Sequence, residues 1–386
     1  MSQLKSKIII IYIIISFLLT GCWDGIDINR RAFVVSMGID KFVFDETKDD
    51  PNLNTELSRY RITFSIPNLP KFVGQQGISE EPKFTRVSVG TTISNTYKAL
   101  ESRINKSIYF GHTKSLLFGQ ELLKDKILLK QTMDTLQRNP DFGKAIPVVA
   151  VEGSVEEALE VLPDTQPMVG IYIMELFDNN RENGGFFDEK SLGDLLQNFE
   201  EDKTGLIPRL SVGEKDLKIE GAAVIKDYEL QGWLDERQLK GLLWILKKDY
   251  RLEISAPYDD YYIAYNVSES NTKIEFLGDN EEIICKVLVE VEGNIDEFIL
   301  DENIFELETI RKLEKVIKKE IENEINYSLE AIQEKYKTDV IQIGKRLERK
   351  KPDVWKKVKD NWDEVFENMQ FIVEAKVNIR RIGQSK

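Results

Sequence analysis

The N-terminal 22 residues constrain the fold of this chain more than any other segment. Lys5 and Lys7 precede an apolar run over residues 8–19, and a Thr-Gly pair then leads to Cys22. A basic stretch, a short apolar core and small residues are typical of a secretory signal peptide. The run of about 12 residues reaches only ~18 Å as a helix, whereas a permanent membrane span needs about 20 residues. The mature chain is therefore expected to fold outside the cytoplasm.

Cys22 gives this signal a specific end, because the preceding Leu-Thr-Gly resembles a lipobox. In that chemistry the thiol receives a diacylglyceryl group through a thioether, and a peptidase then cleaves before the cysteine. Two acyl chains anchor a protein stably, whereas one chain binds a membrane only marginally. The alternative is an ordinary cleavage site with an incidental cysteine. We predict a lipoprotein signal peptide at residues 1–21, lipidation at Cys22, and attachment to the outer face of the cytoplasmic membrane.

The composition favours an acidic globular ectodomain. The chain carries 53 Lys and Arg against 67 Asp and Glu, and its formal net charge of −14 becomes −16 when Lys5 and Lys7 leave with the signal. Nucleic acid is therefore not expected as a partner. An anionic membrane surface is expected to repel the body as a whole. With 41% apolar residues, the 386-residue chain can bury two or three cores.

Cys285 is the only cysteine besides Cys22, so lipidation would leave no pair for an intrachain disulfide. Alternation along the strand-like segment places Cys285 on the same face as Ile283 and Val287. We therefore predict a buried structural thiol rather than a reactive one.

Hydrophobic patterns predict both strands and helices along the mature chain. Alternation predicts strands at residues 33–39, 60–66, 114–118, 145–151, 219–225, 230–233 and 371–379. Helical spacing predicts helices at 93–104 and 355–366 and a long amphipathic helix at 307–336. Ser154 and Glu157 predict a capping box for a helix that reaches Leu162, and Asp235 with Gln238 predicts a second.

This irregular order of strands and helices favours the α+β class over a repeated βαβ fold. We expect a mixed-sheet ectodomain of two or three subdomains, with the long amphipathic helix in the C-terminal domain. The predicted domains are an N-terminal α+β region at 22–205 and a C-terminal α+β domain at 206–386. Gly232 and Gly241 suit close backbone approach. Large apolar anchors are expected at Trp233, Trp244, Trp355 and Trp362.

The residues needed for catalysis or metal binding are scarce. His112 is the only histidine, so neither a zinc site nor a Ser-His-Asp triad has enough candidates, and we expect a structural or interfacial role for it. Gly344-Lys345 lacks the other residues of a phosphate loop. Asp259 and Asp260 leave calcium or glycosidase chemistry open, although a solvated loop is the simpler interpretation. No catalytic residue, cofactor or metal ligand is predicted.

Four stretches resemble one family, in order along nearly the whole chain. They are GCWDGIDINRRAFVVSMGID at 21–40, GHTKSLLFGQELL at 111–123, GAAVIKDYELQGWLDERQLKGLLWIL at 221–246 and GKRLERKKPDVWKKVKDNWDEVF at 344–366. They are similar to the Ger(x)C spore-germination lipoproteins, the C subunits of germinant receptors in endospore-forming Gram-positive bacteria. An ordered match of this length is far more specific than any single motif.

The resemblance implies a function as well as a fold. It implies a lipid-anchored, non-enzymatic receptor subunit that works with two integral-membrane partner subunits in the spore's inner membrane and responds to small-molecule nutrients. The main alternative is a solute-binding lipoprotein of a membrane transporter, which is expected to show two α/β lobes with parallel strands. A tethered cell-wall hydrolase would need an acid/base pair that the sequence does not reveal.

Overall fold

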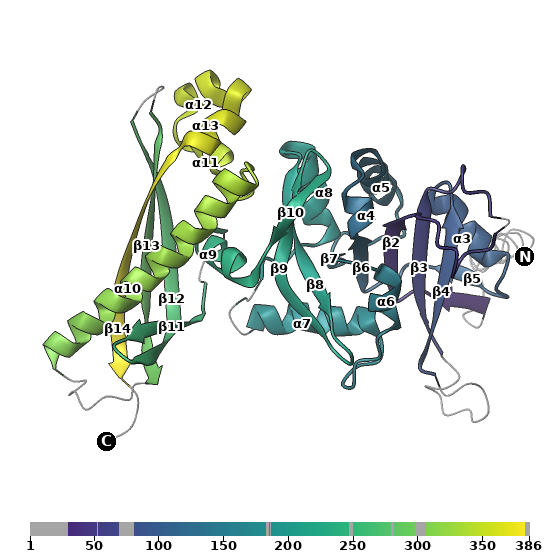
Figure 1. The fold of residues 1–386 in the computed structure, drawn as a ribbon, viewed down its shortest axis with the longest axis horizontal. Coiled ribbons are helices and arrows are strands. Elements are labelled where there is room, and N and C mark those ends of the chain that lie inside the picture. Colours follow the sequence, from purple (N-terminus) through teal and green to yellow (C-terminus); the bar gives the residue numbers. More distant parts are fainter. Residues whose placement is uncertain are drawn as a thin grey trace, which may run out of the picture.

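The computed structural model describes residues 30–51, 53–68, 81–182, 185, 187–246, 250–278, 282–297 and 306–382. The predicted signal peptide and Cys22 lie outside these residues. The molecule is elongated, with a large sheet and its helices toward the N-terminal end and a second sheet, crossed by one long helix, at the opposite end (Figure 1). This mixture of sheets and helices confirms the α+β class.

Eight strands form the large sheet, in the order β10-β9-β8-β7-β6-β2-β3-β4. Strands β2, β6, β7 and β8 are parallel at its centre, and antiparallel strands flank them on both sides. The bounds are β2 (Ser36–Lys41), β3 (Tyr60–Pro67), β4 (Lys83–Gly90), β6 (Ser115–Gly119), β7 (Val148–Val151), β8 (Thr204–Val212), β9 (Leu217–Lys226) and β10 (Glu229–Leu234). A separate parallel pair joins β1 (Arg31–Phe33) to β5 (Ser107–Tyr109).

Helices cover both faces of the large sheet, which explains why its central strands β6 and β7 are buried throughout. Side chains of successive residues enter opposite cores: Leu117 packs with α6 and α7, whereas Leu116 and Phe118 pack with α5 and α8. The helices are α3 (Ile93–Glu101), α4 (Gln120–Leu123), α5 (Lys126–Arg138), α6 (Val155–Glu160), α7 (Val169–Glu182) and α8 (Leu192–Glu201).

Helix α6 is shorter than the sequence predicted. The Ser154 hydroxyl accepts the Glu157 N–H at 3.3 Å, as expected of an N-cap. However, α6 ends at Glu160, and Leu162 lies beyond it with 47% of its surface exposed. The inclusion of Leu162 is therefore wrong, because Pro163 disfavours helical backbone at the residue before it. The reciprocal bonds predicted for Asp235 and Gln238 are present, at 2.7 and 3.1 Å.

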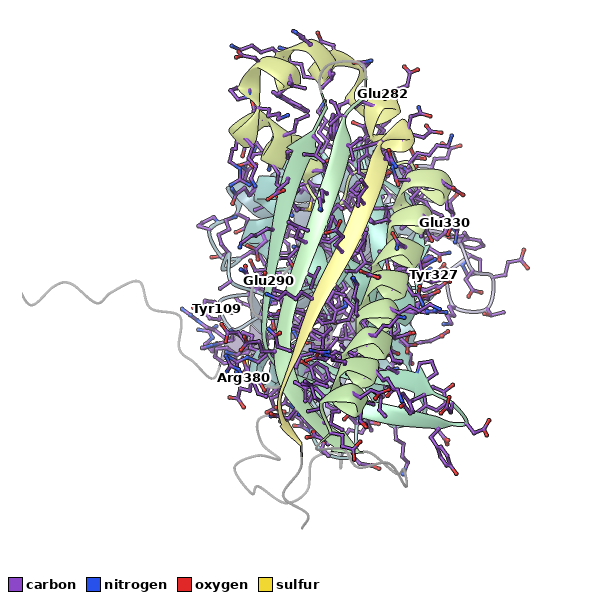
Figure 2. All side chains as sticks on the ribbon, turned by 90° about the vertical axis from the view of Figure 1, so that its left-hand side faces the viewer. Tyr109, Glu282, Glu290, Tyr327, Glu330 and Arg380 are labelled. Carbon is purple, nitrogen blue, oxygen red and sulfur yellow. The ribbon has the colours of Figure 1, made fainter. Side chains whose placement is uncertain are left out.

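The C-terminal sheet has the order β11-β12-β13-β14. Its strands are β11 (Glu253–Tyr258), β12 (Tyr261–Leu277), β13 (Ile284–Glu297) and β14 (Gln370–Ile382), the last pairing in parallel with β13. Helix α10 (Leu307–Glu330) packs on one face, as its predicted apolar stripe requires, and the opposite face is open (Figure 2). Ion pairs cross that open face, among them Lys286–Glu374 at 2.8 Å and Arg380–Glu292.

Helix α9 (Glu236–Leu246) joins the two sheets and packs against α10. A Cβ atom on Gly241 would lie 2.1 Å from the Ser328 hydroxyl and 2.2 Å from the Glu324 carbonyl oxygen, which confirms the predicted close approach. Trp244 is completely buried, and its indole N–H donates to Glu324 at 3.2 Å. The other three predicted tryptophan anchors are only half-buried.

Short helices close the C-terminal end: α11 (Ile343–Lys350), α12 (Pro352–Val358) and α13 (Trp362–Asn368). Pro352 occupies the first turn of α12, which separates it from α11 as expected. The predicted boundary between residues 205 and 206 falls within β8, and the division into domains stays a prediction.

Candidate functional site

His112 lies at the N-terminal end of the molecule, beside the β1–β5 pair, and its side chain is exposed. Its ring centroid is 5.2 Å from that of Phe33 and 5.6 Å from that of Tyr109. The Arg31 guanidinium lies over the Tyr109 ring at 4.7 Å. Within the part of the chain that the structure describes, no carboxylate or hydroxyl forms a hydrogen bond with His112, so the imidazole belongs to an aromatic cluster rather than to a catalytic dyad.

Cys285 is completely buried on β13, as the alternation predicted. Burial raises the pKa of its thiol to about 12, and the negative charge of Asp339 adds to this effect. Because the thiolate is the nucleophilic form, a thiol with this pKa is unreactive at neutral pH.

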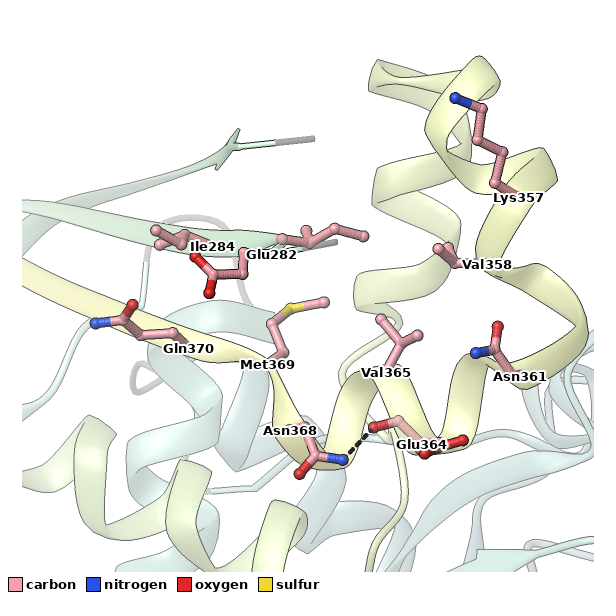
Figure 3. Close-up of a pocket in the computed structure, with 11 residues that line it drawn as sticks. Glu282, Ile284, Lys357, Val358, Asn361, Glu364, Val365, Asn368, Met369 and Gln370 are labelled. Carbon is pink, nitrogen blue, oxygen red and sulfur yellow. Dashed lines mark hydrogen bonds between the residues drawn. The ribbon is translucent and has the colours of Figure 1, made fainter. Parts of the chain in front are cut away.

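A surface depression of about 610 Å³ lies between the start of β13, the start of β14 and helices α12 and α13 (Figure 3). Its floor is apolar and well buried, at Ile283, Val358 and Met369. Its rim is polar and exposed, with Glu282 and Lys357 on opposite sides. The sequence did not single out this depression, because it joins segments about 80 residues apart.

The chemistry of this depression is that of a contact surface. No histidine or cysteine is among the described residues that line it. Cys285, the residue after Ile284 on β13, is completely buried, and its raised pKa keeps the thiol protonated at neutral pH. Among the residues with a described position, no group of three His, Cys, Asp or Glu side chains could hold a metal ion. Asp259 and Asp260 form the exposed turn between β11 and β12, in agreement with the solvated-loop interpretation.

Gly344 and Lys345 make structural contacts in this fold rather than forming a phosphate-binding loop. The Asp339 carboxylate accepts the backbone N–H groups of Ile343 and Gly344 at 2.9 and 2.8 Å, so it caps α11. Lys345 pairs with Asp202 at 2.6 Å, just beyond α8. These bonds tie the C-terminal helices to the large sheet.

Asp40 is an unusual carboxyl that the sequence patterns did not reveal. It lies at the end of β2, where a Cβ atom on Gly119 would be 2.2 Å from its Oδ2. Burial raises the pKa of Asp40 to about 7, although the N–H groups of Lys41 and Leu122 donate to the carboxylate and oppose the shift. The negative charge of Glu121 raises the pKa of Asp40 further, whereas the positive charge of Arg61 lowers it.

The described helices offer no membrane span, since none of them is both long and apolar enough to cross a bilayer. These observations define an α+β protein with an eight-stranded sheet, a four-stranded sheet and a short two-stranded sheet. Its fold matches that of a solved structure, the GerBC protein, with a TM-score of 0.57 at 17% identity over 84% of this chain and 94% of that one.

Two family models match the chain. The model for the spore germination protein N-terminal domain matches residues 24–212, and the model for the spore germination B3/GerAC-like C-terminal domain matches residues 220–383. The chain therefore belongs to this family of spore germination proteins, as the four sequence stretches indicated.

Curated relatives cover nearly the full length. Spore germination protein B3 of Bacillus subtilis (strain 168) is 24% identical over 95% of both chains. Spore germination protein KC of the same organism is 24% identical over 98% of this chain and 96% of its own. Spore germination protein A3, also from that organism, is 23% identical over 98% of both chains.

Proposed function

We propose that this protein is a lipid-anchored, non-enzymatic subunit of a spore germinant receptor complex, required for the germination response to small-molecule nutrients. The observation that carries this proposal is the match of two spore germination models across residues 24–212 and 220–383. The absence of an assembled catalytic or metal site within the described residues is compatible with it.

The anchor in this proposal is a diacylglyceryl group on Cys22, attached after a signal peptide at residues 1–21. The lipobox-like Leu-Thr-Gly before Cys22 supports it. The anchored chain would lie at the outer face of the cytoplasmic membrane, which becomes the inner membrane of the spore. Its partners would be two integral-membrane receptor subunits, and its exposed contact surfaces would meet them.

The transporter alternative gains no support from the fold. A solute-binding lipoprotein was expected to have two lobes with parallel sheets, but the C-terminal sheet pairs β11, β12 and β13 antiparallel. We therefore do not propose solute delivery.

Affinity isolation from detergent-solubilised spore membranes tests the complex directly. Two integral-membrane receptor subunits are expected to accompany the tagged protein. A deletion strain is expected to grow normally and to lose or slow its response to one set of germinants, followed as the fall in optical density. A normal response to every germinant, in a strain without a redundant paralogue, would refute the receptor assignment.

A further inference from the structure

Two segments at the N-terminal end of the molecule have a charge opposite to that of the whole chain. Residues 30–33 and 98–114 contain six Lys and Arg and one acidic residue, whereas the chain carries a net charge of −14. The acidic residue, Glu101, is engaged, because its Oε1 accepts the Ile108 N–H at 2.9 Å. None of the six cations forms an ion pair with a carboxylate in the described ranges.

Strand pairing brings these two segments together. β1 and β5 run in parallel with Arg31 opposite Ser107 and Phe33 opposite Tyr109. Arg30 and Lys106 are the residues just before the first paired residues, so both lie at the same end of the β1–β5 pair. We call the surface formed by Arg30, Arg31, Phe33, Lys106, Tyr109 and His112 the basic-aromatic end.

The aromatic side chains of the basic-aromatic end lie at the surface rather than in the hydrophobic core. Phe33 and Tyr109 are half-buried and meet edge to face with centroids 5.8 Å apart, and the exposed His112 ring contacts both. Amphipathic rings and basic side chains together are the residue types enriched where proteins meet lipid headgroups.

Chain length keeps this surface close to the proposed anchor. Only seven residues lie between Cys22 and Arg30, so the eight Cα–Cα steps of a fully extended connection span at most about 29 Å. The contact would be local, because charges are screened over about 8 Å at physiological salt. A basic end can therefore meet an anionic bilayer although the body as a whole is acidic, which refines the repulsion expected from net charge alone.

We propose that the basic-aromatic end is a membrane-contacting surface that binds the headgroups of anionic phospholipids beside the Cys22 anchor and so orients the acidic body away from the bilayer. This proposal rests on the lipid anchor of the proposed function. It assigns His112 and Tyr109 to the interface, and it places the open C-terminal sheet, at the opposite end in Figure 1, far from the lipid.

The test places a fluorescent label near the basic-aromatic end of the acylated full chain. Cys285 is buried, so a cysteine introduced by Asn105→Cys is the accessible thiol, and Asp360→Cys provides a distant control. Each labelled protein is reconstituted with vesicles of phosphatidylcholine, with or without phosphatidylglycerol, that carry a headgroup-attached quencher. Quenching at residue 105 is expected to increase severalfold on anionic vesicles and to fall at 0.5 M salt, while residue 360 stays unchanged.

Charge reversal separates an electrostatic contact from simple proximity. Arg30→Glu with Lys106→Glu is expected to abolish the lipid dependence of quenching. Lys356→Glu with Lys359→Glu makes the same change in net charge on exposed residues around α12 and is expected to leave it intact. Circular dichroism checks that both variants fold.

Four outcomes are decisive. If the protein floats with both vesicle types and quenching at residue 105 is the same on neutral and anionic vesicles, the proposed role of the basic-aromatic end is refuted and the lipid anchor still stands. Flotation with anionic vesicles alone, with an unmodified Cys22 by mass spectrometry, would refute the anchor and support the surface, and flotation with neither would refute both. Quenching that requires the integral-membrane subunits but not anionic lipid would assign the surface to a protein partner and overturn the lipid proposal.

Discussion

At the scale of single residues, Asp40 is a side chain whose charge depends strongly on the fold. Its carboxyl has a pKa of about 7 in the folded protein against 3.8 as the ordinary value, because burial disfavours the charged form. The folded state therefore resists ionisation more than the unfolded state does. The contribution of Asp40 to stability is therefore fully present below about pH 4, falls as the pH rises from 4 to 7, and is lost above about pH 7.

Asp40→Asn removes this ionisation and is expected to raise the free energy of unfolding at pH 8 by about 2 kcal/mol. The full shift would correspond to ~4 kcal/mol, but partial exposure and hydrogen bonds to the charged form reduce it. At pH 4 the variant and the wild type are expected to be nearly equal. Urea unfolding at both pH values measures the difference, with the exposed Asp353→Asn as a control. An equal effect at both pH values would contradict this prediction.

At the scale of helices and strands, the sequence predicts most elements whose burial follows a simple period. The stripe at Leu313, Ile317, Ile321 and Ile325 is completely buried, as expected for α10. Close approach between elements is predicted only where glycine marks it, as at Gly241. The depression beside α12 and the basic-aromatic end could not be predicted, because each depends on pairing between segments that are distant in the sequence.

Gly241→Ala tests the close contact between α9 and α10. Alanine is the better helix former by about 1 kcal/mol, but its Cβ would overlap the Glu324 carbonyl oxygen on α10. We expect a net loss of about 2 kcal/mol in the free energy of unfolding, since overpacking typically costs 1–3 kcal/mol. Gly143→Ala, where the nearest atom is 3.7 Å from the new Cβ, is the control and should change stability little. If Gly241→Ala instead raised the free energy of unfolding, α9 and α10 would have to move apart at little cost, which would contradict this prediction.

The edge strand β14 is protected by carboxylates from α10. Glu322 accepts the Ala375 N–H at 2.9 Å, and Glu314 accepts the Ile379 N–H at 3.2 Å. Unpaired N–H groups along a strand edge are sites for pairing with another chain. Glu314→Ala with Glu322→Ala is expected to cost about 1–2 kcal/mol and to cause concentration-dependent association in sedimentation velocity. The exposed pair Glu308→Ala with Glu330→Ala should stay monodisperse, and the same behaviour in both variants would argue against edge protection.

At the scale of the whole molecule, fold class and family follow from the order of motifs along the chain, whereas orientation requires the structure. Net charge alone predicts that a membrane repels this protein. The fold nevertheless brings Arg30, Arg31 and Lys106 to one end of the molecule, while the open sheet and the depression in Figure 3 lie at the opposite end. The sequence alone does not reveal this arrangement, because it depends on the pairing of Arg31 with Ser107, which are far apart in the chain.

Germination assays on Cys22→Ala and His112→Gln strains separate anchoring from catalysis. Cys22→Ala removes the only thiol available for lipidation, so the protein is expected to lack the diacylglyceryl group and the strain to germinate as slowly as a deletion. His112→Gln keeps a polar side chain at an exposed position, so folding should persist and the rate of optical-density loss should change less than about threefold. An enzyme that used this lone histidine as its general base would instead lose about 10²- to 10⁴-fold in rate. Complete loss of germination in a folded His112→Gln protein would therefore contradict the non-enzymatic role, and an unmodified Cys22 in the wild type would contradict the anchor.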